Sequence, residues 1–194
     1  MKATTLRRRH LVLAVPALAA ACGSSPDPVL YTIPMKPGPV LGSGPKNVQV
    51  RDIALASYLD RKEVVRSSEN YKLGVASNDW WGEGLGTMLG RVIVLGLNQR
   101  LSGSNVYAEG GAISPDANAV LGVNIQRLDL NGSGQLELVA QAAVEFQIPR
   151  RPALARSFHI IKSPPTDKVA GEVAAITDAV AELTDGLAAM LRPS

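Results

Sequence analysis

The sequence predicts an α/β fold of the α+β type, a two-layer sandwich in which two amphipathic helices pack on one face of a mostly antiparallel β-sheet. Apolar side chains occupy every second position from Leu136 to Ile148, which is the period of a strand with one buried face. They recur every three or four positions over residues 85–101 and 169–191, which is the period of an amphipathic helix. These three segments are the basis of the predicted fold.

The first 21 residues are typical of a bacterial secretion signal. Lys2 and Arg7–Arg9 precede an apolar run, Leu11–Ala21, which has about half the length of a membrane-spanning helix. Leu18–Cys22 resembles a lipobox, whose cysteine carries diacylglycerol and, after cleavage, an N-acyl chain. The alternative is ordinary cleavage at Ala19–Ala21, which leaves Cys22 as a free thiol. We therefore divide the chain into a signal peptide (1–21), a lipidated tether (22–28) and one domain (29–194).

The charge balance excludes nucleic acid as the expected partner. Of 20 basic residues, four lie in the signal peptide, which has no acidic residue, so 16 basic residues face 17 acidic ones in the remainder. A chain without a surplus of cations lacks the electrostatic footprint of a nucleic-acid-binding protein. Because Cys22 is the only cysteine, its acylation leaves none for a disulfide, and packing alone must hold the domain together.

The first half of the domain predicts short strands and one long loop. Val29–Ile33 is a short strand, and residues 34–45, with four prolines and three glycines, form an extended surface loop. Strands follow at 48–53 and 63–66, joined by a turn-like link over 54–61. Alternation of Tyr71, Leu73 and Val75 with smaller or polar residues predicts another strand with one buried face.

The first helix is predicted over residues 83–101. Gly82, Gly84 and Gly86 precede or open it. A glycine-rich phosphate loop is the functional alternative for these residues, but the Lys-Ser/Thr pair of such a loop is missing. We interpret them as glycines that let the chain turn into the helix.

A long hairpin is predicted in the second half of the domain. Residues 120–130 and 136–148 pair through Asn131–Gly134, whose residue types accept positive φ. The apolar parity of the first strand switches between Ile125 and Leu128, and a bulge near Gln126 or Arg127 restores one-sided burial. A further strand covers 154–161.

The last helix is predicted to start at Thr166 or Asp167, whose side-chain oxygens suit an N-cap. Its apolar stripe runs from Val169 to Leu191 in steps of three or four, while Lys168, Glu172, Asp178, Glu182 and Asp185 occupy other faces. Docking on the domain's own sheet is favoured over an intermolecular coiled coil, because the stripe lasts about three heptads and Gly171 and Gly186 weaken the helix.

The sequence predicts that the protein is not an enzyme and holds no metal. The domain has one histidine, His159, flanked by Phe158 and Ile160 on a strand, where a surface or hydrogen-bonded role is more common than catalysis. A zinc cluster, a His-based triad and a thiol nucleophile all need residues that the domain lacks. Glu137 and Glu145 share a strand face but lie eight residues apart, about 26 Å at strand rise, too far for an acid/base pair.

Four segments, taken in order, resemble a known family. They are Leu30–Pro34, Tyr58–Arg61, Asn78–Trp81 heading the first helix, and the strand pair that ends near Phe146. The chain resembles the ABC-type transport auxiliary lipoproteins, the paraquat-inducible protein C group. The resemblance implies an outer-membrane lipoprotein, on the periplasmic face in a Gram-negative bacterium, that works with an MCE-domain protein and an inner-membrane transporter in lipid transport. It implies no catalytic residue, and the acyl chains on Cys22 are the only groups expected on the protein.

The predicted interaction surface comprises Leu59, Asp60, Arg61, Trp80 and Trp81, because exposed Trp and Arg are common interface anchors. The alternative is that both tryptophans cap the core, with one buried and one exposed as an intermediate arrangement. Two other function classes stay open. A lipid-binding lipoprotein would use a cavity that Ala140, Ala142 and Ala143 leave between helix and sheet, and a structural envelope lipoprotein would need none. Homo-oligomerisation also stays open.

Overall fold

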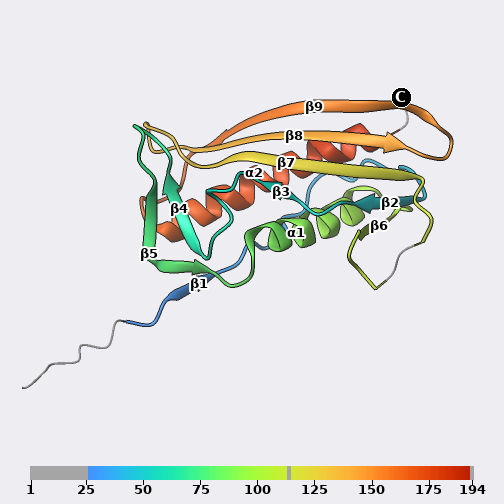
Figure 1. Ribbon diagram of the computed structural model, residues 1–194. Helices are drawn as coiled ribbons and strands as arrows, with labels where there is room; N and C mark the ends of the chain where they lie inside the picture. Colours follow the sequence, from blue (N-terminus) through green and yellow to red (C-terminus); the bar gives the residue numbers. More distant parts are fainter. Residues whose placement is uncertain (1–25, 113–114, 193–194) are drawn as a thin grey trace, which may run out of the picture.

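Two helices cover one face of a large mixed sheet (Figure 1). The computed structural model describes residues 26–112 and 115–192, so the signal peptide and Cys22 lie outside the described residues. The predicted two-layer α+β sandwich is confirmed.

The elements follow one another with short connections, apart from the loop between the first two strands. The strands are β1 (Val29–Tyr31), β2 (Asn47–Val50), β3 (Ala54–Leu55), β4 (Glu63–Ser67), β5 (Gly74–Trp81), β6 (Asn105–Ala108), β7 (Ala119–Leu130), β8 (Leu136–Phe146) and β9 (Arg151–Lys162). The helices are α1 (Leu85–Arg100) and α2 (Val169–Leu191).

The sheet is organised around the long strand β7. One edge of β7 pairs along its whole length with β8, and β9 follows, both antiparallel. The other edge pairs in turn with β2, β3 and β4, all parallel. Beyond these, β6 lies next to β2, and β5 and β1 lie beyond β4. The three long strands therefore form an antiparallel meander, and the other strands are added along the edge of β7 that faces away from β8.

The predicted β7–β8 hairpin is confirmed, including its bulge. The register shifts between Ile125 and Arg127, so that Gln126 is the extra residue. In the turn, the Asn131 backbone N–H donates to Gln135 O over 2.8 Å, and Gly134 has φ +73°. The bulge keeps Leu121, Ile125 and Leu128 on the buried face.

The docking of α2 on its own sheet is also confirmed. Its apolar stripe is buried throughout. The helix approaches β9 so closely that a Cβ on Gly186 would lie 2.4 Å from Phe158 Cε1, so this glycine provides the space for the contact.

Two details of α2 differ from the prediction. The helix starts at Val169, and no side chain caps it; the backbone oxygen of Lys168 accepts from the N–H of Gly171 over 2.9 Å. Glu172 is not on a solvent face but has no exposed surface. It lies three residues from Val169 and four from Ile176, which places it on the apolar stripe.

The region before α1 differs most from the prediction. Tyr71 and Leu73 do not lie on a buried strand face. Asn70 and Tyr71 form a turn with φ +54° and +60°, which leaves Tyr71 fully exposed and Leu73 partly so. Asn78–Trp81 is the end of β5 rather than the head of the helix. The turn into α1 occurs at the predicted glycines, with Gly84 at the N-cap position.

The loop over residues 34–45 is held against the end of α1. Gly38 and the Gln99 side-chain amide exchange two hydrogen bonds, of 2.9 and 3.0 Å. The N–H of Leu41 donates to Arg100 O over 2.8 Å. This loop is therefore a fixed part of the domain surface, as its prolines predict.

Candidate functional site

The structure divides the predicted interaction residues between the core and the surface. Leu59 is 1% exposed and Trp81 is 7% exposed, and both belong to the main hydrophobic core. Asp60 and Arg61 are exposed and Trp80 is half-buried. Leu59 and Trp81 are therefore core residues of the monomer, while Asp60, Arg61 and Trp80 are available to a partner.

The two tryptophans point to opposite faces of β5 because side chains alternate along a strand. Trp81 packs into the core, and its backbone N–H donates to Lys62 O over 2.7 Å. The Trp80 indole N–H donates to Ser77 O over 3.2 Å, and Lys62 Nζ lies 3.8 Å from the centre of the Trp80 ring. One tryptophan is thus structural, and the other is a surface group with a cation on its face.

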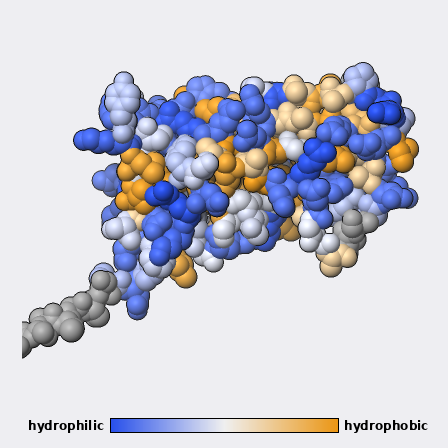
Figure 2. All heavy atoms as spheres, in the orientation of Figure 1, coloured by the Kyte–Doolittle hydropathy of each residue, from blue (hydrophilic) through white to orange (hydrophobic). Residues whose placement is uncertain are grey.

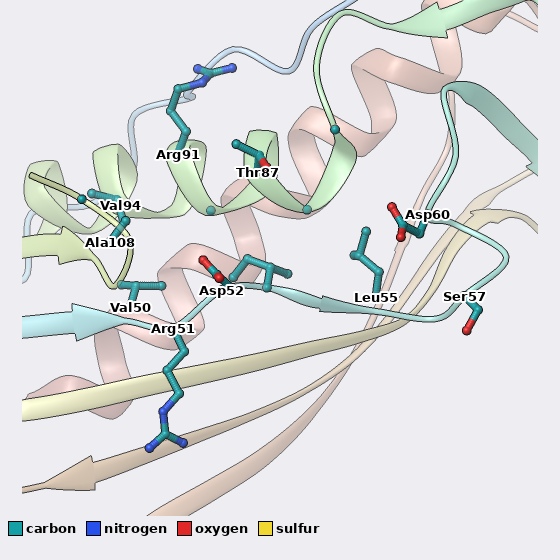
Figure 3. Close-up of a pocket in the computed structure, with 16 residues that line it drawn as sticks. Val50, Arg51, Asp52, Leu55, Ser57, Asp60, Thr87, Arg91, Val94 and Ala108 are labelled. Carbon is teal, nitrogen blue, oxygen red and sulfur yellow. The ribbon is translucent and has the colours of Figure 1, made fainter.

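A groove near these residues lies between α1 and the segment from β2 to β3, and we call it the α1 groove (Figure 3). It has a volume of 640 Å³. Small and apolar residues make up most of the wall, and two aspartates lie among them. The lining residues are Val50, Arg51, Asp52, Ile53, Leu55, Ser57, Asp60, Gly84, Gly86, Thr87, Gly90, Arg91, Val94, Ala108, Gly110 and Gly111.

The charged ends of both arginines lie outside the groove. Figure 3 shows Arg91 pointing away on the far side of α1 and Arg51 pointing toward the opposite side of the β2–β3 segment. Arg91 pairs with Glu83 at 2.5 Å, and Arg51 pairs with Glu145 at 3.2 Å. Within residues 26–112 and 115–192, Asp52 and Asp60 have no basic side chain within 4.0 Å. The groove is therefore apolar and mildly acidic.

One strand edge is free along the groove. β3 pairs only with β7 among the described strands, so the opposite edge of Ala54–Leu55 has backbone groups without a strand partner. Sheet edges of this kind accept an added strand from a partner. The groove thus combines an apolar wall, two carboxylates and a short unpaired backbone edge.

A second groove, of 570 Å³, crosses the sheet where β7, β8 and β9 run side by side. Gly122, Ala143 and Ala155 lie in register across these strands and form its floor. Of the alanines expected to leave a cavity between helix and sheet, Ala140 and Ala142 are buried and Ala143 is exposed. The small residues therefore make room on the sheet's open side, on the face away from the helices.

A cluster of charges centred on Arg127 was not predicted. Arg127 contacts Asp129 and Glu137 at 3.0 Å each, and it also pairs with Glu69. Tyr58 donates to Asp129 over 2.9 Å, and burial, followed by this hydrogen bond, raises the pKa of Tyr58 to about 12. These contacts stabilise the bulge and the turn that carries Asp60. Asp129 could have indicated this cluster in the sequence, because it is a carboxylate between two leucines of a strand.

His159 has the surface role that the sequence predicts. Its side chain is exposed, and Nε2 lies 2.8 Å from Glu137 Oε1. Within the described residues, no group of three or more His, Cys, Asp or Glu side chains is arranged to hold a metal ion. Glu137, which pairs with both His159 and Arg127, links this histidine to the charge cluster.

Glu172 is a second buried charge that was not predicted. Arg66 Nε lies 2.8 Å from Glu172 Oε2, but the contact is misaligned, and in the described part of the chain neither carboxylate oxygen accepts a hydrogen bond. Burial raises the pKa of Glu172 from 4.5 to about 8, with Arg66 opposing the shift and Asp129 adding to it. Burial thus favours the protonated form of Glu172 in the folded protein, against the nearby charge of Arg66.

We expect Glu172 to make the domain less stable at alkaline pH. The folded state holds this proton more tightly than the unfolded chain, so the stabilisation is complete below about pH 4.5 and is lost as the pH rises through about 8. Melting curves at pH 6 and pH 9 should show a fall in Tm for the native chain, and Glu172→Gln should reduce that fall. Glu182→Gln, which removes an exposed carboxylate from the same helix, should leave it unchanged. An equal fall in all three proteins would contradict the assignment.

Comparisons with known proteins agree with the fold. A family model described as an ABC-type transport auxiliary lipoprotein component matches residues 31–188. No curated protein matches the chain by sequence. A crystal structure described only as that of an uncharacterized protein has a TM-score of 0.71 at 18% identity, and the match covers 84% of this chain and 98% of that one. A Xanthomonas campestris protein of the DUF330 family has a TM-score of 0.64 at 16% identity, and the match covers 82% of this chain and 92% of that one.

Neither described helix has the length and apolar character that crossing a bilayer requires.

Proposed function

Because the chain belongs to the ABC-type transport auxiliary lipoprotein family, we propose that it is a non-catalytic docking component of an MCE/ABC-type system that moves lipids between membranes. In this proposal, acyl chains on Cys22 hold it on the periplasmic face of the outer membrane. The α1 groove binds the MCE-domain protein, and the MCE-domain protein links this chain to the inner-membrane transporter. The family match, which covers most of the domain, is the observation that carries the proposal.

The anchor is supported by the signal peptide and the position of Cys22. Each buried CH₂ contributes about 0.8 kcal/mol, so that one acyl chain is marginal and two or more give a durable anchor. Gly23 follows the cysteine, which by analogy with sorting in enteric bacteria favours release to the outer membrane.

We expect Cys22→Ser to abolish acylation, because a hydroxyl group cannot form the thioether. The variant should appear as a soluble periplasmic protein or as uncleaved precursor, and labelled palmitate should be incorporated only into the native chain. Ser24→Ala, two residues along the tether, is the matched control and should be labelled normally. Label in the Cys22→Ser protein would exclude Cys22 as the acylated residue.

The α1 groove is the surface best suited to a protein partner. Its apolar wall favours burial of apolar side chains, and Asp52 and Asp60 favour a segment that carries Lys or Arg. The free edge of β3 adds backbone hydrogen bonds for an extended segment. We therefore expect the occupant to be an extended, basic and partly apolar segment of the MCE-domain protein.

Filling the groove should weaken that complex. Thr87 is exposed on the groove side of α1, so Thr87→Trp should obstruct the groove. The variant should raise the Kd for the MCE-domain partner by about tenfold or more and leave the melting curve nearly unchanged. Leu95→Trp makes the same change at an exposed α1 position outside the groove and should bind normally. Asp60→Lys should weaken binding most at low salt. Normal binding by both groove variants would move the search to the polar sheet face around Glu137, Gln141 and Glu145.

A second function, direct binding of a lipid, is favoured by one observation. The groove over Gly122, Ala143 and Ala155 has small side chains along its floor, which suits an acyl chain. Native mass spectrometry of the extracted protein separates the two functions. A copurified lipid that is lost on Ala143→Trp supports lipid binding, and a lipid-free protein supports docking alone.

A further inference from the structure

The corner of the molecule at which the tether enters exposes an unusual set of side chains. β1 is an edge strand that pairs only with β5 among the described strands. Val29 is 51% exposed and Leu30 is 64% exposed. Leu30 is in register with Trp80 on β5, so their side chains lie on the same face. We call Val29, Leu30, Lys62 and Trp80 the β1 corner.

The chemistry of the β1 corner suits a lipid–water boundary. An indole has an apolar body and one polar N–H, which places Trp at the headgroup level of membranes. Lysine extends an apolar stem and keeps its ammonium group in water, and Lys62 does so across the ring of Trp80. Leu30 shares the face of Trp80, and Val29 is exposed on the other face of the same edge strand. At this end of the domain hydrophobic residues lie among hydrophilic ones (Figure 2). Leu30, an indole and a lysine therefore meet on one surface, with Val29 beside them at the edge.

The tether confines this corner to the neighbourhood of the bilayer. Cys22 and Val29 are seven positions apart, which corresponds to about 25 Å of fully extended chain. Figure 1 shows β1 at one end of the elongated domain, whereas the turn that joins β8 to β9 lies at the other end. An anchor at Cys22 therefore keeps the β1 corner at high local concentration near the headgroups.

The charges around the corner indicate how it would bind. Arg61 and Lys62 are cationic, while Asp27, Glu63 and Asp79 are acidic neighbours in sequence or register. Asp79 accepts a hydrogen bond from Tyr31 over 3.0 Å. Because neither sign dominates, contact with a bilayer would depend on the apolar side chains more than on anionic lipid.

We propose that the β1 corner rests in the headgroup layer of the bilayer that holds Cys22, so that the domain stands with this end against the membrane and presents the α1 groove beside it. The proposal rests on the acylation of Cys22 in the proposed function. It adds a second, non-covalent membrane contact and a fixed orientation of the groove relative to the bilayer.

The test uses the two tryptophans as reporters in the acylated chain. Trp81→Phe leaves only Trp80, and Trp80→Phe leaves only Trp81. Each protein is placed on phosphatidylcholine vesicles with or without a lipid that carries a nitroxide quencher near the headgroup. Trp80 fluorescence should fall about twofold with the quencher, because interfacial groups lie about 5–10 Å into the boundary. Buried Trp81 should lose little.

A further variant tests the apolar contact. Leu30→Asp, made in the Trp81→Phe protein, changes an exposed residue and should leave the melting curve within about 0.5 kcal/mol of its parent. It should also remove the quenching of Trp80. If Trp81→Phe lowers the melting temperature, a second reporter replaces Trp80. It is a fluorescent label on the thiol of Lys62→Cys, made in the Cys22-acylated chain. Quenching that persists in Leu30→Asp would overturn the role of the apolar side chains.

Flotation of the vesicles separates this proposal from the anchor. A protein that floats but whose Trp80 is not quenched has an anchor and no corner contact, which overturns the proposal. A protein that does not float lacks the acyl anchor, and coupling Cys22, the only thiol, to a maleimide lipid then restores attachment so that quenching decides the question. If Trp80 is shielded only when the MCE-domain protein is added, the corner is a protein contact and the proposal is wrong.

Discussion

Replacing Arg100 by methionine is expected to lower the free energy of unfolding by about 3 kcal/mol. Arg100 is 1% exposed although it carries a full charge. Its Nε donates to Asp185 over 2.5 Å, and its Nη atoms donate to Gly96 O over 3.1 Å and to Ala181 O over 3.2 Å. Removing the guanidinium leaves the carboxylate of Asp185 without this donor and takes from the two carbonyls a hydrogen bond that adds to those within their helices.

The position of Arg100 explains why the effect should be large. The guanidinium joins α1 and α2, and it also donates to Lys36 O in the 34–45 loop over 3.4 Å. A Cβ on Gly38 would lie 2.3 Å from Arg100 Nη2, so the loop can approach only because residue 38 is glycine. One side chain therefore joins two helices and the loop, in addition to the contacts that Lys36, Gly38 and Leu41 make with the helices. Asp185 is 39% exposed, which places the expected cost at the low end for a buried ion pair.

Thermal melting of Arg100→Met measures this effect, with an expected fall in Tm of about 6–12 °C. Arg91→Met is the matched control, since Arg91 lies on the same helix and pairs with Glu83 at the surface, where an ion pair contributes about 0–1 kcal/mol. Arg100→Lys should recover little, because an ammonium group cannot replace the planar fork of donors. Equal melting temperatures for the Arg100 and Arg91 variants would show that the buried contacts are not stabilising.

The long elements could be predicted because their patterns repeat many times. α1, α2 and the β7–β8 hairpin each show several periods of burial, and the parity switch near Gln126 even located the bulge. The pairing of β2, β3 and β4 with β7 could not be predicted, since parallel pairing between distant short strands leaves no local pattern. Tyr71 and Leu73 show that two or three alternating residues are too few to predict a strand. Tyr71 belongs to a turn whose positive φ values have no glycine signal, and Leu73 lies between this turn and β5.

The burial of Glu172 and Arg100 could have been predicted from their spacing in the sequence. Glu172 stands three residues after Val169 and four before Ile176, so its place on the apolar stripe followed from helix geometry. Arg100 likewise follows Leu97 by three residues and Gly96 by four. Their partners were not predictable, because Arg66 and Asp185 are distant in sequence. The family, in contrast, was predicted from the order of four short segments, and the match over residues 31–188 confirms it.

Replacement of Trp81 by alanine is expected to have the largest effect, a loss of about 3–5 kcal/mol. Trp81 is 7% exposed and belongs to the core, and truncation of such a side chain leaves a cavity that the surrounding structure fills only in part. Its backbone N–H already bonds to Lys62 O, so the loss comes from packing of the ring. Trp81 is therefore a structural residue of the core.

Trp80→Ala is the matched control one residue away on the same strand. Trp80 is half-buried on the outer face, and its contact with Lys62 is expected to contribute about 0.5–1 kcal/mol. Thermal melting should therefore separate two neighbouring tryptophans by at least about 2 kcal/mol, with Trp81→Ala the less stable. If Trp80→Ala melts as early as Trp81→Ala, Trp80 is a structural residue as well. If Trp81→Ala melts like the native chain, Trp81 is not the core residue that its burial indicates.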